Sequence, residues 1–274
     1  MQRLELEEWC ESKARFWDKA VKGSSALQAA LDALVRDEVA QEEGLNRLSL
    51  FWDLEKFYDT IALHKLIQAG REFEYPAELL LLALRCYLGP RLIVWMGTAG
   101  DWMFPNTSIC AGCIQANNMA RMTMYVVLDK MHVMHPQVEL SQFVDDVKMA
   151  EEGVCKYVVA WELAQVGVDF RKECREMMLK ISDGKSGAVA SSLEVGKEFQ
   201  KALRRKYAGI QVKEEMRYLG GDSTGAKKRS VKAAKERESA ADKRQRRVGT
   251  IGLDRVKSRT WKTAAWAKGT TTCP

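Results

Sequence analysis

Two adjacent aspartates, Asp145 and Asp146, constrain this chain most, because they lie between two short apolar runs. The runs, Val138–Val144 and Val147–Met149, contain β-branched and aromatic residues, which predicts a β-hairpin with an acidic tip. Acidic residues are common in β-turns, since Asp tolerates turn geometry and bonds its own backbone. The pair alone therefore does not establish a metal site, and the rest of the sequence must show whether the two aspartates bind a metal.

The composition is that of a folded chain without a membrane segment. Of its 274 residues, 46% are hydrophobic, which is enough for a substantial core. No apolar run is long enough to span a bilayer, so we expect no membrane partner. The acidic N-terminus lacks the apolar core of a secretory signal. Seven scattered cysteines favour reduced thiols in an intracellular protein, either nuclear or cytoplasmic.

Positive charge is concentrated at the C-terminal end. Residues 226–274 contain 15 Lys and Arg against 4 Asp and Glu, a balance of +11. Since the whole chain carries +6, residues 1–225 carry −5. A basic segment of this kind favours a polyanion partner such as nucleic acid. A solvated tail without a partner is the equally weighted alternative.

Hydrophobic spacing predicts a mixed fold. It predicts helices over residues 26–40, 114–134, 155–166 and 193–207, and strands over 48–53 and 177–181. Ser24 or Ser25 is expected to cap the first of these helices, and Gly167 to end the third. The mixture favours an α+β fold in which helices cover one face of a sheet. If the strand ending at Asp53 adjoins the acidic hairpin, three carboxylates meet at one edge.

Three converging carboxylates indicate a particular chemistry. They repel one another unless cations neutralise them. Hard oxygen ligands suit Mg²⁺, whose coordination shell is usually completed by water and substrate phosphates. Two such ions, about 3.5–4 Å apart, stabilise the attacking and leaving oxygens of an in-line displacement. A strand-end Asp, a distant Asp-Asp hairpin and a basic tail together fit nucleotide transfer.

Five stretches resemble reverse transcriptases of the non-LTR retroelement and group II intron type. Phe51–Ile61 resembles their first palm motif, and Phe143–Asp146 resembles their aromatic-x-Asp-Asp motif. Asn106–Cys113 takes the place of the glycine-containing template-grip motif. Residues 167–186 resemble the helix–loop–lysine motif, and Tyr218–Gly220 the Leu-Gly hairpin near the primer. The stretches occur in the family's order.

The resemblance implies a domain organisation. Residues 47–225 would form a right-hand polymerase palm, an antiparallel sheet backed by helices. Residues 1–46 would be a partial helical fingers segment, and residues 226–274 a basic tail or the start of a thumb. Complete family members carry more fingers and thumb sequence, so we expect a partial chain.

The resemblance also implies a metal site. Asp53 and Asp145 would be the main ligands of two Mg²⁺ ions, with Asp146 as the third acid. Mn²⁺ could take the place of Mg²⁺. The backbone carbonyl of Leu54 would complete one coordination shell.

Three further residues would handle the substrates. Tyr58 would pack under the incoming sugar and exclude a 2′-hydroxyl, and Lys185 would protonate the leaving pyrophosphate. Gly112 would let the backbone approach the template–nucleotide pair. From the residues alone, Tyr58 could equally be a core aromatic and Lys185 a solvated loop lysine.

The implied function is RNA-directed DNA polymerase, acting on an RNA template, a DNA primer and deoxynucleoside triphosphates. One alternative is a catalytically inactive remnant that binds nucleic acid through its basic tail. An RNA-templated RNA polymerase is another, although Tyr58 argues against it. The chain departs from the family pattern where Ala111 stands in place of Gln and Ala116-Asn117 in place of Ser-Pro. These departures concern substrate handling more than metal binding.

Overall fold

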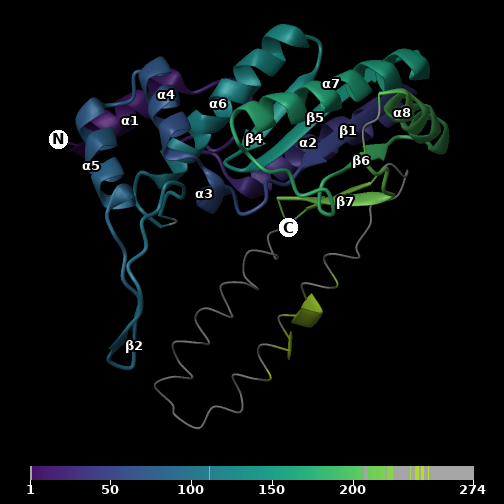
Figure 1. The fold of residues 1–274 in the computed structure, drawn as a ribbon. Helices are drawn as coiled ribbons and strands as arrows, with labels where there is room; N and C mark the ends of the chain where they lie inside the picture. The colour runs from purple at the N-terminus through teal and green to yellow at the C-terminus, as the bar shows by residue number, and fades with distance from the viewer. Residues whose placement is uncertain are drawn as a thin grey trace.

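A four-stranded antiparallel sheet, ordered β4-β5-β1-β6, forms the centre of the computed structural model (Figure 1). Its strands are Glu139–Phe143 (β4), Asp146–Gly153 (β5), Asn46–Trp52 (β1) and Gly187–Ala190 (β6). Two separate hairpins pair Val94–Trp95 (β2) with Thr98–Ala99 (β3), and Glu215–Tyr218 (β7) with Gly221–Thr224 (β8).

The structure describes residues 2–110, 112–206, 209–219 and 221–224, with isolated positions between 235 and 246. The predicted basic tail, residues 226–274, therefore lies outside the described residues except at those positions. Ala111 and Gly220, which belong to two of the predicted motifs, lie outside them as well.

The pairing of β1 with β5 brings distant parts of the chain together. It runs from Asn46 opposite Gly153 to Trp52 opposite Val147. Strands β4 and β5 form the predicted acidic hairpin, with Phe143 opposite Asp146. The strand that ends at Asp53 and the acidic hairpin are thus neighbours, as the sequence led us to expect.

Helices α7 (Lys156–Glu176) and α8 (Leu193–Arg205) pack on one face of this sheet, and α6 (Ala116–Met134) packs against α7 (Figure 1). Leu48, Leu50 and Trp52 alternate along β1 and bury their side chains in this core, as the two-residue period of a strand requires. The helices run over Gln2–Lys13 (α1), Ala26–Glu42 (α2), Phe57–Thr60 (α3), Leu63–Glu72 (α4), Ala77–Leu88 (α5), Ala116–Met134 (α6), Lys156–Glu176 (α7) and Leu193–Arg205 (α8).

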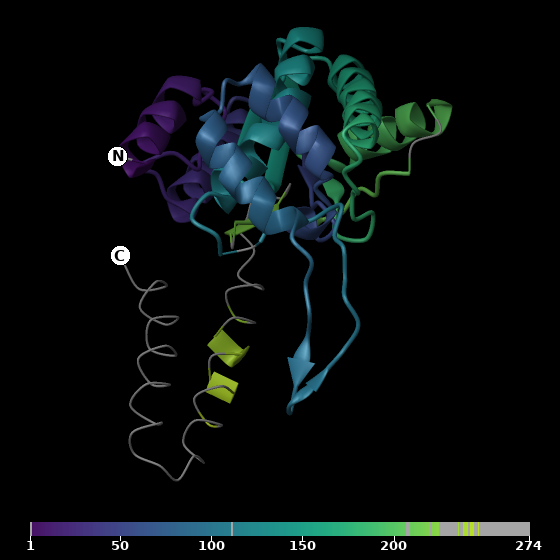
Figure 2. The same cartoon turned by 60° about the vertical axis from the view of Figure 1, so that its left-hand side comes forward.

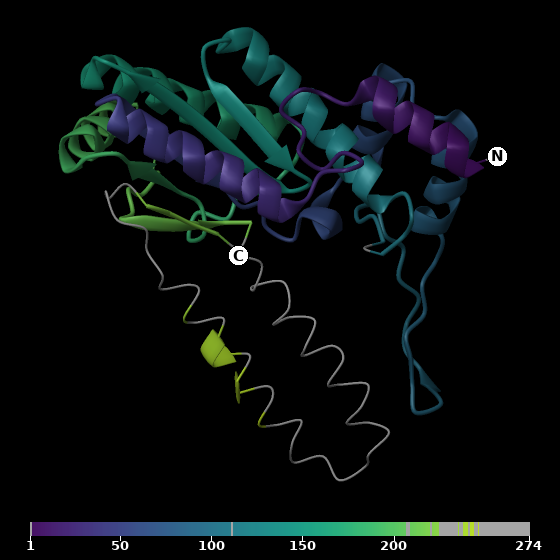
Figure 3. The same cartoon turned by 180° about the vertical axis from the view of Figure 1, so that it is seen from behind.

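The expected sheet backed by helices is confirmed, and its opposite face is covered as well. Helix α2 lies across this face (Figure 3). Here Phe51 of β1 packs with Ala33 of α2, Val189 of β6 and Tyr218 of β7 in a second buried cluster. Apolar residues fall on both faces of β1, and its residues from Arg47 to Trp52 are all buried, as expected for a strand that is covered on both sides.

Two predictions of local structure are corrected. Gly167 does not end helix α7, which continues to Glu176. The glycine instead lets the side chain of Ile210 approach the helix closely. A Cβ at Gly167 would lie 2.7 Å from the side chain of Ile210. The predicted strand over residues 177–181 does not form: Met177 and Met178 make a turn, with Met178 at φ 61°, and Ile181 makes only a single bridge to Leu54.

One local prediction is confirmed. Ser25 caps α2, since its side chain accepts a hydrogen bond from the Gln28 N–H. The six cysteines described by the structure are free thiols. Over the described residues, no helix combines the length and apolar character needed to cross a bilayer.

A charged network joins α2 to the sheet. Lys148 of β5, whose side chain is 1% exposed, places Nζ 3.0 Å from Asp37 Oδ1 on α2. Arg47 of β1 contacts the same oxygen at 2.7 Å and reaches the carboxylates of Glu139 and Glu152, each at 2.6 Å. Burial alone would raise the pKa of Asp37. The positive charges of Lys148 and Arg47 lower it by more than burial raises it, so the pKa lies below its ordinary value.

Replacing Asp37 by Ala leaves Lys148 buried without its carboxylate. We expect Asp37→Ala to lower the free energy of unfolding by about 3–5 kcal/mol at pH 7, measured by urea denaturation. The matched change Asp32→Ala, at an exposed position of the same helix, should change it by less than about 0.5 kcal/mol. Because the folded pKa of Asp37 is depressed, the difference should shrink as the pH falls below about 4. Equal effects of the two changes would contradict this role.

Candidate functional site

The acidic turn is fixed by the hairpin register. Val144 and Asp145 are the two residues between the paired positions Phe143 and Asp146. Val144 has φ 59°, a left-handed conformation that is strained for a β-branched residue. The Gln142 side chain donates to the Val144 carbonyl at 2.9 Å, which helps to hold this turn. The strain therefore lies beside the first of the two acids.

Asp53 reaches the same end of the sheet from β1. It directly follows Trp52, which pairs with Val147, so the register places Asp53 beside Asp146. The loop before β6 fixes its backbone: the Asp53 N–H donates to Ser186 Oγ at 3.0 Å, and the Ser182 N–H donates to the Asp53 carbonyl at 2.8 Å. Leu54, which follows, is buried and forms a bridge with Ile181.

The three acids influence one another electrostatically. Burial raises the pKa of Asp146 to about 6, with further contributions from Asp145 and Asp53. The pKa of Asp145 is also raised, first by burial and then by Asp53, while Lys185 opposes the rise. Lys185 is 75% exposed, and its Nζ lies 3.5 Å from Asp53 Oδ2. The structure thus brings together four of the residues predicted from the sequence.

The donor set fits a hard divalent cation. Three carboxylates supply the oxygen ligands that Mg²⁺ prefers. Asp53 Oδ2 is buried and has no hydrogen-bond partner, which leaves a lone pair available to a cation. Over the described residues, however, no group of three or more His, Cys, Asp or Glu is already spaced as a metal site.

Tyr58 lies beside these acids and not in the centre of the core. It belongs to α3, where Phe57 takes the buried position and Tyr58 remains half-buried. The Tyr58 hydroxyl donates to Asn117 Oδ1 at 2.7 Å. Burial and the nearby Asp145 raise the pKa of Tyr58. The ring therefore borders the acidic site while its hydroxyl is held by α6.

Gly112 has an open position ahead of α6. Its φ of 91° favours glycine, and a Cβ built there would meet no atom within 4 Å. The preceding segment runs along α3, since the Ile109 N–H donates to the Tyr58 carbonyl at 2.9 Å. The chain around Gly112 is thus held near Tyr58 and leaves free space on its outer side.

A segment that no sequence pattern predicted supports the acidic hairpin. Residues 17–19 extend the sheet beside β4, because the Gln142 N–H donates to the Trp17 carbonyl and the Lys19 N–H to the Gln142 carbonyl, at 2.9 and 2.7 Å. Asp18 between them is buried and pairs with Arg121 and the Tyr125 hydroxyl of α6. Because more than 100 residues separate Asp18 from these partners, no local pattern could reveal them.

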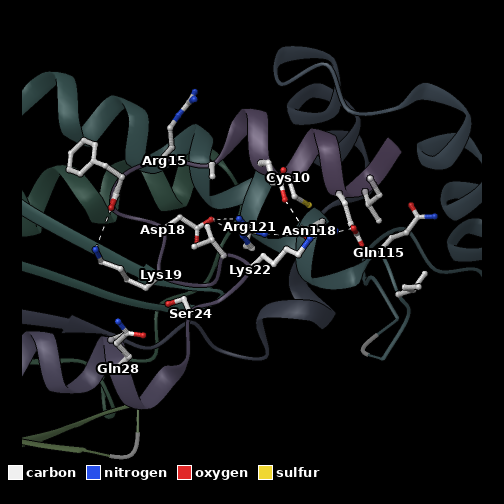
Figure 4. Close-up of a pocket in the computed structure, with 18 of the residues that line it drawn as sticks. Cys10, Arg15, Asp18, Lys19, Lys22, Ser24, Gln28, Gln115, Asn118 and Arg121 are labelled. Atoms are coloured by element: carbon white, nitrogen blue, oxygen red, sulfur yellow. Dashed lines mark hydrogen bonds and ion pairs between the residues drawn. The ribbon is translucent and has the colours of Figure 1, made fainter. Parts of the chain in front are cut away.

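A cavity of about 1300 Å³ adjoins this segment, between α1, the start of α2 and the start of α6 (Figure 4). It is lined by Arg15, Lys19 and Lys22 together with Gln115 and other residues, but not by the three acids. This cavity is therefore not the acidic site. We locate the chemistry at the acids, because burial and like charges raise two carboxyl pKa values there, beside an Asp53 oxygen that has no hydrogen-bond partner.

Solved structures of telomerase from Candida tropicalis are similar in fold. The complex with a TWJ fragment of telomeric RNA has a TM-score of 0.58 and 10% identity, over 84% of this chain and 37% of that chain. The apo enzyme has a TM-score of 0.54 and 11% identity, over 84% and 40%. The apo form truncated from its C-terminal domain has a TM-score of 0.53 and 10% identity, over 83% and 44%. This chain thus spans less than half the length of each telomerase chain.

The family is shown by a comparison with family models. The model described as reverse transcriptase (RNA-dependent DNA polymerase) matches residues 9–222, which is most of the chain. No curated protein matches the chain. The resemblance to the non-LTR and group II intron type stays a prediction. The site and the match agree, and the chain belongs to the reverse transcriptase family.

Proposed function

We propose that this chain is the catalytic palm of an RNA-directed DNA polymerase, which extends a DNA primer on an RNA template. The observation that carries the proposal is the meeting of Asp53 with Asp145 and Asp146 at one end of the β1–β5 pair. Burial and mutual repulsion raise carboxyl pKa values there, as is typical of sites that hold cations or transfer protons.

In the proposed reaction, the primer 3′-hydroxyl releases its proton to solvent as its oxygen attacks the α-phosphorus of a deoxynucleoside triphosphate. A new phosphorus–oxygen bond forms, and the bond from the α-phosphorus to the bridging oxygen breaks, which releases pyrophosphate. Asp53 and Asp145 would hold two Mg²⁺ ions, with Asp146 as the third acid and the Leu54 carbonyl as a further ligand. Bound there, the ions supply charge neutralisation for the attacking and leaving oxygens.

The remaining residues position the substrates. Lys185 lies beside Asp53 and is exposed, so it can reach a triphosphate and donate a proton to the leaving pyrophosphate. Tyr58 borders the acids and would exclude a 2′-hydroxyl by steric contact. Gly112 offers a backbone without a side chain, against which the template–nucleotide pair would pack.

Removing one acid tests the proposed activity. Asp145→Asn should reduce primer extension on poly(rA)/oligo(dT) about 1000-fold, since several kcal/mol of transition-state stabilisation depend on the held cations. Glu55→Gln, an exposed change two residues from Asp53, should leave extension within about threefold. A wild-type chain that binds nucleic acid but extends no primer would favour the inactive-remnant alternative.

Cation binding can be measured without turnover. We expect 10 mM MgCl₂ to raise the melting temperature of the wild-type protein by about 2–4 °C, which corresponds to roughly 1 kcal/mol of linked binding. EDTA should reverse the gain, and Asp145→Asn should abolish it while melting at least as high as the wild type without metal. A gain of equal size in Asp145→Asn would place the cation elsewhere.

Sugar selection tests Tyr58. Tyr58→Val should lower the preference for deoxynucleotides over ribonucleotides, as a ratio of kcat/KM, by about 10–100-fold, because a steric contact with a small group contributes about 1–3 kcal/mol. Asn117→Ala removes the hydrogen bond to the hydroxyl but keeps the ring, so selection should largely persist. If Tyr58→Val leaves selection unchanged, Tyr58 is a packing residue, and the argument against an RNA-templated RNA polymerase is lost.

A further inference from the structure

A long apolar hairpin extends from the body of the molecule. We call residues 91–104 the hydrophobic arm; it begins at the bridge between Arg91 and Met103 and ends in the paired strands β2 and β3. All three ribbon views show it projecting away from the helices and the sheet (Figures 1, 2 and 3). The proposed reaction gives this arm no role.

The arm exposes an unusual amount of apolar surface. Trp95 is 73% exposed, Met96 89% and Phe104 77%. Five more large apolar side chains of the arm are exposed, namely Leu92, Ile93, Val94, Trp102 and Met103. Folded monomers seldom leave contiguous apolar patches larger than a few hundred Å² in water. A surface of this kind therefore indicates a contact with another molecule.

Both faces of the arm are apolar. Trp95 lies opposite Thr98 and shares its face with Ile93, whereas Val94 lies opposite Ala99 on the other face. Neither face is buried against the described part of the chain. A two-stranded hairpin alone is marginally stable in water and needs further strands or a packing partner. Its strands also lack the lysines and prolines that normally protect an exposed edge.

The charge of the arm selects among partners. Residues 91–104 contain one cation, Arg91, and one anion, Asp101, so the net charge is zero. Nucleic acid binding depends on several Lys or Arg contacts to phosphates, which the arm does not provide. A neutral apolar surface suits a protein surface of the same character, and it presents no charge that would oppose contact with a second copy of itself.

The area of the arm is sufficient for a dimer. With about 150–250 Å² for each aromatic side chain and less for each aliphatic one, the exposed part of the arm amounts to roughly 1,000 Å² over its two faces. A stable interface buries about 800 Å² on each partner, so a contact that covers both faces is large enough. Twofold interfaces use the same patch on both subunits, so a surface that is apolar on both faces can pair with its own copy.

We propose that the hydrophobic arm is a homodimer contact, in which the arms of two copies pack against each other. The pairing covers the apolar faces and completes a β-structure too small to persist alone. This inference does not depend on the catalytic proposal, because no arm residue belongs to the acidic site.

Sedimentation velocity on the full, nuclease-treated chain between 1 and 100 µM tests the inference. The wild type should form a dimer with a Kd below about 10 µM, a value within the range of modest protein interfaces. Trp95→Glu should weaken the dimer at least 100-fold, since a buried charge replaces an apolar contact. Val154→Glu, at a position that is 86% exposed outside the arm, should leave the Kd unchanged. A wild type that remains monomeric at 100 µM overturns the proposal.

Further measurements separate loss of contact from loss of folding and from other partners. Trp95→Glu and Trp95→Lys should keep the wild-type circular dichroism spectrum, and mixing the two should restore association if arm meets arm. Dimerisation should be at least as strong in 0.5 M NaCl as in 0.15 M, because an apolar contact is not screened. A dimer that Trp95→Glu leaves intact, or one that dissociates in 0.5 M NaCl, would contradict an arm-to-arm contact. Wild-type monomers that bind RNA through Trp95 would also contradict an arm-to-arm contact.

Discussion

The pairing of β1 with β5 is the constraint on which the rest of the site depends. Its register runs over seven residue pairs and ends at Trp52 opposite Val147, so the next residue of each strand is an acid. Slipping this register by one residue would turn every buried side chain of β1 to the opposite face. Because β1 is buried on both faces, that slip is strongly disfavoured. The packing that stabilises the fold therefore also sets the positions of Asp53 and Asp146.

Charge is distributed in opposite ways on the α2 face of this strand pair and at its acidic end. On the α2 face, an acid meets two cations, since Asp37 is shared by Lys148 and Arg47. At the acidic end, the exposed Lys185 opposes the rise of the Asp145 pKa, but burial raises the pKa values of both Asp145 and Asp146. The first arrangement is neutralised within the protein and fastens α2 to the sheet. The second leaves unbalanced negative charge, which a cation and a nucleotide can neutralise on binding.

The parts of the fold that the sequence predicted are those set by local patterns. An acidic turn between two β-branched runs and a serine ahead of an apolar-periodic segment each specify a structure within a few residues. Gly167 shows the limit of this reasoning, because its role as a close contact to Ile210 depends on a segment about 40 residues away. The support of the acidic turn by residues 17–19 is hidden for the same reason, since its partners belong to other elements.

Likeness of fold and likeness of site carry different weight for function. At 10–11% identity, the similarity to telomerase structures establishes the arrangement of strands and helices, and one such arrangement can host many functions. The acids carry more weight, because their positions serve a chemistry that a stable core would avoid. Three carboxylates, two of them with raised pKa values, cost stability. The strained Val144 adds to that cost. A fold that keeps such a site is most simply explained by a use for it.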